Sequence, residues 1–238
     1  MNKTTLLIIA GALVMTACNN KSLKVHALFV DTTGSTATLK EKNPQKIMNY
    51  IKKMLNEKVE SGETVVIYPI HSQTATSAPI GEWKMPLDKG DMGDQRRRKQ
   101  AIKNIIPEVK SVLFDHSRIT PRVRLNTSLF PIFTKVKRLS SKGNVEVTIF
   151  SDMLEDNASL CFADLFNRME KREIKNLAVK QYDERREEMS IIGTNIRILY
   201  PSTVVGDHDL EKIMRKVDTF WETFFNEAGA NLSISDLS

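Results

Sequence analysis

The chain has 238 residues, of which 41% are apolar and 27% are charged, and its formal net charge is +6. These proportions are ordinary for a soluble globular protein and argue against an intrinsically disordered chain, a polytopic membrane protein and a fibrous repeat. Two cysteines exclude a disulfide-rich scaffold and a zinc site built from cysteines alone.

The N-terminal segment differs in character from the rest of the chain. Lys3 precedes an unbroken run of apolar and small residues from Leu6 to Met15. The run is about half as long as a bilayer-spanning helix needs to be, and a basic start before a short apolar run is typical of a secretory signal peptide. The residues at 15–18, Met-Thr-Ala-Cys, resemble the bacterial lipobox. This resemblance implies that Cys18 carries a lipid and becomes the mature N-terminus.

The lipobox resemblance divides the chain into residues 1–17 as a lipoprotein signal peptide, 18–23 as the lipidated cysteine with a short tether, and 24–238 as one domain. It implies a protein of the cell envelope, anchored to a membrane through Cys18 on the periplasmic or extracellular side. Because the tether reaches about 20 Å at most, we expect the domain to lie close to the membrane. A soluble secreted protein with a coincidental cysteine is the alternative. In either case, export argues against a nucleic-acid partner despite the positive charge.

Apolar periodicity along residues 24–238 predicts strands that alternate with helices. In chain order, we expect a strand at 24–30, a helix that begins at 43 and ends before Gly62, strands at 64–70 and 80–85, helices at 91–114 and 127–139, a strand at 145–150, a helix at 163–189, a strand at 195–200 and a helix at 210–225. Pro107 is expected to kink or divide its helix. This order indicates an α/β fold, a doubly wound and mostly parallel sheet with helices on both faces.

Two of the predicted strands end in carboxylates, Asp31 and Asp152. Binding sites in doubly wound sheets lie beyond the carboxyl ends of the strands, so these residues are the first candidates for a site. In the segment Asp-Thr-Thr-Gly-Ser at 31–35, the hydroxyls of Thr33 and Ser35 follow the Asp31 carboxylate at alternate positions. Oxygen-only ligands suit a hard cation. We therefore predict a site for Mg²⁺, or for another divalent cation such as Mn²⁺ or Ca²⁺.

This segment resembles the D-x-S/T-x-S motif that opens the metal-ion-dependent adhesion site of von Willebrand factor type A domains. That family completes its site with a threonine that opens a later helix and an aspartate that ends a later strand, which Thr127 and Asp152 match. The resemblance spans residues 25–228 and implies that the metal ligands are Asp31, Thr33, Ser35, Thr127 and Asp152. It also implies a fold of the von Willebrand factor A type and a non-catalytic site that docks the Asp or Glu of a protein partner.

Two alternatives use the same residues. The sequence Phe-Val-Asp-Thr-Thr-Gly-Ser at 29–35 is similar to the first motif of haloacid dehalogenase-like phosphotransferases, in which the aspartate is a covalent nucleophile. In that case Asp31 would accept a phosphoryl group, and Asp152 with Asp156 would hold Mg²⁺. That family also needs a lysine on the phosphate, for which the available candidates are Lys135, Lys137 and Lys142. The other alternative is a metal-free scaffold subunit of the von Willebrand factor A fold.

Overall fold

A six-stranded sheet organises the part of the chain that the computed structural model describes, residues 24–33, 43–114, 126–157, 160–189, 191–201 and 208–237. Its strands are β1 (Lys24–Asp31), β2 (Thr64–Ile70), β3 (Gly81–Lys84), β4 (Asn144–Phe150), β7 (Asn195–Tyr200) and β8 (Asn231–Asp236). The short strands β5 (Asp156–Asn157) and β6 (Leu160–Cys161) pair separately. The helices are α1 (Asn43–Glu57), α2 (Asp94–Phe114), α3 (Pro131–Ser140), α4 (Phe162–Arg168), α5 (Lys171–Arg185) and α6 (His208–Glu227).

The order of the large sheet is β3-β2-β1-β4-β7-β8. All of its neighbouring strands run parallel except β2 and β3, so β3 is an antiparallel edge strand. Counted within this sheet alone, the order is that of a doubly wound fold, and it reverses direction between β1 and β4. The predicted fold class is therefore confirmed, and the point where a ligand crevice is expected lies at the carboxyl ends of β1 and β4.

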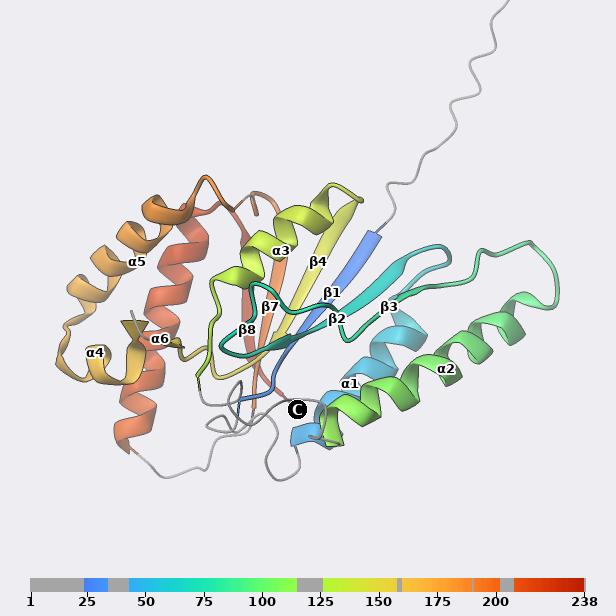
Figure 1. Cartoon of the computed structure of the whole chain (residues 1–238), viewed down its shortest axis with the longest axis horizontal. Helices are drawn as coiled ribbons and strands as arrows, with labels where there is room; N and C mark the ends of the chain where they lie inside the picture. The colour runs from blue at the N-terminus through green and yellow to red at the C-terminus, as the bar shows by residue number, and fades with distance from the viewer. Residues whose placement is uncertain are drawn as a thin grey trace, which may run out of the picture.

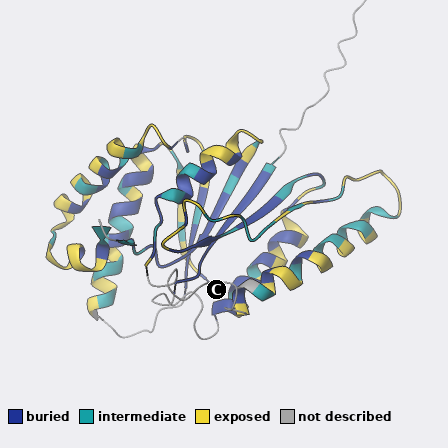
Figure 2. Cartoon of the chain, in the orientation of Figure 1, coloured by how far each residue is buried: buried dark blue, intermediate teal, exposed yellow. Residues whose placement is uncertain are grey.

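Helices cover both faces of the sheet (Figure 1). Successive residues of β1 alternate between two apolar cores, because side chains of a strand point to opposite faces. Ala27 and Phe29 belong to the core that the helices α3 to α6 cover, whereas Leu28 and Val30 belong to the core under α1 and α2. Figure 2 shows buried residues along the central strands and exposed residues on the outer sides of the helices. Among the described residues, no helix combines the length and the apolar character that crossing a bilayer requires.

Four details differ from the sequence-based expectations. The helix expected at 127–139 begins only at Pro131, a residue well suited to a first helical turn. The helix expected at 163–189 is divided into α4 and α5, and a capping box between Glu170 and Glu173 starts the second. Pro107 lies inside α2 and does not divide it. The strands β5, β6 and β8 were not expected.

Candidate metal site at the carboxyl ends of β1 and β4

The candidate site lies where β1 and β4 end side by side. The parallel register pairs Val30 with Phe150, so Asp31 on β1 is level with Ser151 after β4. Asp31 and Ser151 are fully buried. The two strands therefore end in polar side chains that are buried from solvent. They do so at the point where the strand order reverses.

Both carboxylate oxygens of Asp31 accept hydrogen bonds. Its Oδ1 accepts one from the backbone N–H of Thr33 at 3.0 Å and one from the Thr33 hydroxyl at 2.7 Å. Its Oδ2 accepts one from the Ser151 hydroxyl at 2.8 Å. The Ser151 oxygen in turn accepts the backbone N–H of Met153 at 3.0 Å. Asp31 therefore ties the segment after β1 to the segment after β4.

Thr127 reaches the same cluster from a distant part of the chain. Its hydroxyl oxygen lies 3.1 Å from the hydroxyl oxygen of Thr33. The backbone of Thr127 is held by a two-way bridge to Asp156, with N–H to carbonyl distances of 2.9 and 3.1 Å. Thr127 therefore does not open α3 but sits in an extended segment that precedes the helix by four positions. Pairing with β5, and not helix formation, orients its side chain.

Asp152 follows Ser151 and is largely buried. Its Oδ1 accepts the backbone N–H of Leu154 at 3.1 Å, which closes a tight turn. Met153, inside this turn, has a φ of 58°, a left-handed conformation that is unusual for a residue with a side chain. The indole N–H of Trp221 on α6 donates to the Met153 carbonyl at 2.9 Å. A buried aromatic residue of α6 thus stabilises the turn that carries Asp152.

Burial and mutual repulsion make the two carboxylates poor anions on their own. Burial raises the pKa of Asp31 to about 6, against the opposing effect of its hydrogen bonds. Burial and, secondly, the charge of Asp31 raise the pKa of Asp152 to about 7. Among the described residues, no Lys or Arg forms an ion pair with either carboxylate. A divalent cation would supply the missing positive charge, and a donor set of carboxylate and hydroxyl oxygens fits a hard cation.

A third buried carboxylate, Glu155, was not singled out from the sequence. Its Oε2 accepts the backbone N–H of Leu129 at 2.6 Å, and its Oε1 accepts from the Asn157 side chain. Burial raises the pKa of Glu155 to about 7, against these hydrogen bonds. Glu155 joins the loop after β4 to the segment between Thr127 and α3, so it helps to hold Thr127 in place.

The structure brings Asp31, Thr33 and Thr127 together by hydrogen bonds, and Asp152 lies close enough for the charge of Asp31 to raise its pKa. Ser35 and Cys18 lie outside the described residues. Within the described ranges, no three His, Cys, Asp or Glu side chains cluster as a metal site. The candidate set differs from such a cluster because hydroxyls, and not further carboxylates, complete it. Metal binding by these residues remains a prediction.

Ser151 belongs to the cluster but was missed in the sequence. It directly precedes Asp152 at the end of a predicted strand. The signal that would have found it is the register between β1 and β4, which places Ser151 level with Asp31. The pairing of two strands and its register depend on the tertiary structure and cannot be predicted from the sequence of either strand alone.

The geometry disfavours the phosphotransferase alternative. A nucleophilic aspartate must reach its substrate, whereas Asp31 is fully buried and both of its oxygens accept hydrogen bonds. The lysines available for a phosphate contact are engaged elsewhere. Lys135 Nζ donates to the Ser77 carbonyl at 2.7 Å, Lys137 Nζ donates to the Glu187 carbonyl at 2.6 Å, and Lys142 pairs with Glu82 at 3.1 Å.

No protein-family model matches this sequence, and a comparison with curated proteins found no match. Among solved structures, the chain is similar to proximal thread matrix protein 1 from the mussel byssus. Two structures of that protein, one of them in a second crystal form, match at TM-scores of 0.40 and 0.38 with 13% sequence identity. A third, described as having a zinc-occupied MIDAS motif, matches at 0.37, also with 13% identity. The matches cover 87% of this chain but only 46–48% of the mussel protein, about half of its length. A likeness at this level concerns the arrangement of the backbone and does not extend to ligands.

Proposed function

We propose that this chain is an envelope-anchored lipoprotein that binds a protein partner through a divalent-cation site at the carboxyl ends of β1 and β4. The cation is Mg²⁺ or another divalent ion such as Mn²⁺ or Ca²⁺, and the partner presents an Asp or Glu side chain. The observation that carries the proposal is the meeting of the Thr33 and Thr127 hydroxyls at 3.1 Å beside the buried carboxylate of Asp31.

The donor set supports partner binding and not hydrolysis. The hydroxyls of Thr33 and Ser151 both donate to the Asp31 carboxylate, which therefore holds them in fixed orientations. Thr127 is held there by its backbone bridge to Asp156. When bound, the cation would bring a double positive charge, which neutral hydroxyl ligands neutralise only in part. The remaining positive charge would attract the carboxylate of a partner.

The position of the site also fits an anchored protein. β1 begins at Lys24 and ends at Asp31, so the lipid tether that we predict at residues 18–23 joins the opposite end of the strand from the site. In this arrangement, the site faces away from the membrane and toward a partner in the envelope space. Mass spectrometry of the native protein tests the lipid on Cys18, and a Cys18→Ser variant should leave the membrane fraction.

A capture experiment tests partner binding. The chain is incubated with envelope extract in Mg²⁺ or in EDTA, as the wild type, as Asp31→Ala, and as Asp183→Ala, a charge-matched control on the exposed surface of α5. We expect the wild type and the control to retain a specific partner in Mg²⁺ and to lose it in EDTA. Asp31→Ala should not retain it in either buffer. Equal recovery in every lane would instead favour the metal-free scaffold of the same fold.

A further inference from the structure

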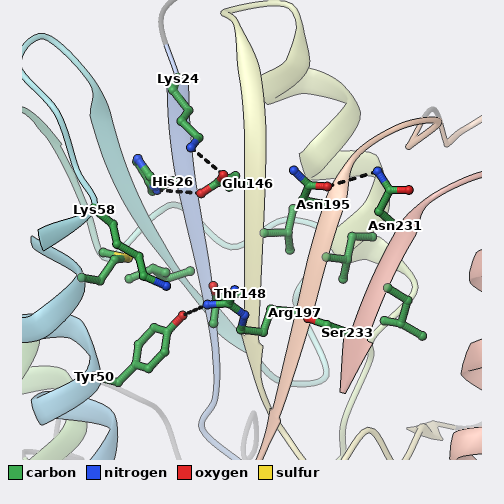
Figure 3. A pocket seen from close by; sticks show the side chains of 15 residues that line it. Lys24, His26, Tyr50, Lys58, Glu146, Thr148, Asn195, Arg197, Asn231 and Ser233 are labelled. Carbon is green, nitrogen blue, oxygen red and sulfur yellow. Dashed lines mark hydrogen bonds and ion pairs between the residues drawn. The ribbon is translucent and has the colours of Figure 1, made fainter. Parts of the chain in front are cut away.

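A cavity of about 520 Å³ lies on the face of the sheet beside α1 (Figure 3). It is near the amino ends of the parallel strands, whereas Asp31 lies at the carboxyl end of β1. Its floor consists of β1, β4, β7 and β8. Its wall is α1, from which Tyr50 extends, and the turn directly after α1, which carries Lys58. We call this cavity the polar sheet pocket. Its size is within the range of small-molecule sites, about 300–1,000 Å³.

The floor of the polar sheet pocket is polar where a doubly wound sheet is ordinarily apolar. The strand register aligns two rows of side chains across it. One row is His26, Glu146, Asn195 and Asn231, and the other is Leu28, Thr148, Arg197 and Ser233. The first row is largely satisfied internally, because Glu146 pairs with Lys24 at 2.5 Å and His26 lies 2.7 Å from Glu63. The second row contains the groups that are available to a ligand.

Thr148 is the most informative of these groups. It is 8% exposed, and its hydroxyl forms no hydrogen bond with any part of the chain that the structure describes. Among the described residues, the fully enclosed side-chain polar atoms without a partner are Arg97 Nε and Gln181 Oε1. The Thr148 hydroxyl is not one of them, so its oxygen remains accessible to solvent. It therefore keeps its contact with the polar sheet pocket. In this position the hydroxyl can form its hydrogen bonds with water or with a ligand in the pocket.

Arg197 is the cross-strand neighbour of Thr148 on β7. Its Nη1 donates to the Tyr50 hydroxyl at 2.9 Å, a contact that orients the guanidinium over the pocket (Figure 3). Within the described residues, neither Arg197 nor Lys58 pairs with a carboxylate. An oriented guanidinium whose other N–H groups face a cavity is the arrangement that binds planar or tetrahedral oxyanions.

We propose that the polar sheet pocket binds the oxyanion of a phosphate-bearing molecule, with Arg197 and Thr148 as donors and Lys58 as a second positive charge. The Ser233 hydroxyl is a further polar group of the second row. Asn195 and Asn231, whose amides hydrogen-bond each other at 3.1 Å, line the cavity beside it. The phosphate can belong to a soluble phosphate ester or to a lipid headgroup. The proposal does not depend on the metal site, because the two sites lie at opposite ends of the strands.

The test uses the full chain in two arms. In the first, thermal unfolding is followed against inorganic phosphate, with chloride at equal ionic strength as the reference. In the second, cosedimentation is measured with phosphatidylcholine vesicles with and without phosphatidic acid, so that the apolar N-terminal segment contributes equally to both. The variants are Arg197→Met, Thr148→Val and the matched control Arg172→Met on the exposed surface of α5.

We expect phosphate to stabilise the wild type and Arg172→Met, with the apparent affinity at least about tenfold weaker in Arg197→Met and about fivefold weaker in Thr148→Val. Stabilisation by phosphate without a preference for phosphatidic acid assigns a soluble ester. A preference for phosphatidic acid that Arg197→Met loses and Arg172→Met keeps assigns a lipid headgroup. The proposal is overturned if the wild type responds to neither probe, or if Arg197→Met and Arg172→Met respond alike in both arms.

Discussion

The hydroxyl oxygens of Thr33 and Thr127 meet at 3.1 Å although the two residues are 94 positions apart in the chain. Both threonines are 1% exposed, and Thr33 also donates to the buried carboxylate of Asp31. Two hydroxyls and a carboxylate from two distant segments thus lie together at the carboxyl end of β1. This convergence is the structural basis of the proposed cation site, and it leads to the following predictions.

Replacing Thr127 by valine removes one hydroxyl and keeps the shape of the side chain. We expect Thr127→Val to weaken Mg²⁺ binding by about tenfold or more, since loss of a ligand or of its hydrogen-bonded neighbour has effects of this size. Calorimetric titration of the full chain with Mg²⁺ measures the change. Thr219→Val on α6, whose hydroxyl bonds the Arg215 carbonyl, is the matched control and should bind as the wild type does. Equal affinities for all three proteins would remove Thr127 from the site.

Replacing Asp31 by asparagine removes a buried charge. Burial raises the pKa of Asp31, which means that the fold disfavours the ionised carboxylate when no cation is present. In EDTA at pH 7.5, we therefore expect Asp31→Asn to be as stable as the wild type or more stable by about 1–2 kcal/mol. Urea unfolding gives the comparison. A large loss of stability in EDTA would mean that the carboxylate acts mainly as a structural hydrogen-bond acceptor.

Glu155 should make the stability of the chain depend on pH. Its pKa is raised from 4.5 to about 7 in the folded chain, so its favourable contribution is fully present below pH 4.5 and is lost as the pH rises through 7. Glu155→Gln keeps an acceptor for the Leu129 N–H and removes the titration. Relative to the wild type, we expect this variant to gain stability as the pH rises, by on the order of 3 kcal/mol between pH 4.5 and 8.

Urea unfolding in EDTA across this pH range provides the measurement for Glu155. Glu57→Gln, on the exposed surface of α1, controls for the loss of one negative charge. A stability difference between Glu155→Gln and the wild type that stays constant with pH would show that Glu155 does not titrate in this window.

Trp221 should contribute to stability through both its packing and its hydrogen bond. Trp221→Phe removes the indole N–H that bonds the Met153 carbonyl and leaves a gap among Phe130, Phe133 and Phe224. We expect a loss of about 2–4 kcal/mol in the free energy of unfolding. Trp83→Phe, the same substitution on the half-buried edge strand β3, should cost less. Equal losses at the two positions would contradict a special role of Trp221 in supporting the turn that carries Asp152.

The parts of the fold with strong apolar periodicity could be predicted from the sequence. The buried strands at 64–70 and 195–200 were expected with the bounds that the structure shows, because they are compact β-branched and apolar runs. The strand β8 was missed because its sequence Asn-Leu-Ser-Ile-Ser-Asp is short and mostly polar, as suits an exposed edge. The boundary at Glu170 was missed because the helical pattern continues on both sides of a cap formed by glutamates.

The candidate site shows the same division. Asp31 and Asp152 could be placed from the sequence, since each follows a recognisable strand. The way in which Thr127 is positioned could not, because it depends on a backbone bridge to Asp156 in a two-residue strand that has no periodicity of its own. Glu155 was missed for a related reason, since nothing in its local sequence indicates that it is buried.

The most direct test of the central claim is the unfolding free energy of the wild-type chain as a function of Mg²⁺ concentration, at constant ionic strength. A cation that binds the folded chain alone stabilises it by about 2.7 kcal/mol at a concentration one hundred times its dissociation constant. We predict a logarithmic rise of stability with Mg²⁺ that Asp31→Asn abolishes. Stability that does not change with Mg²⁺, Mn²⁺ or Ca²⁺, or a rise of equal size in Asp31→Asn, would contradict a cation site at the carboxyl ends of β1 and β4.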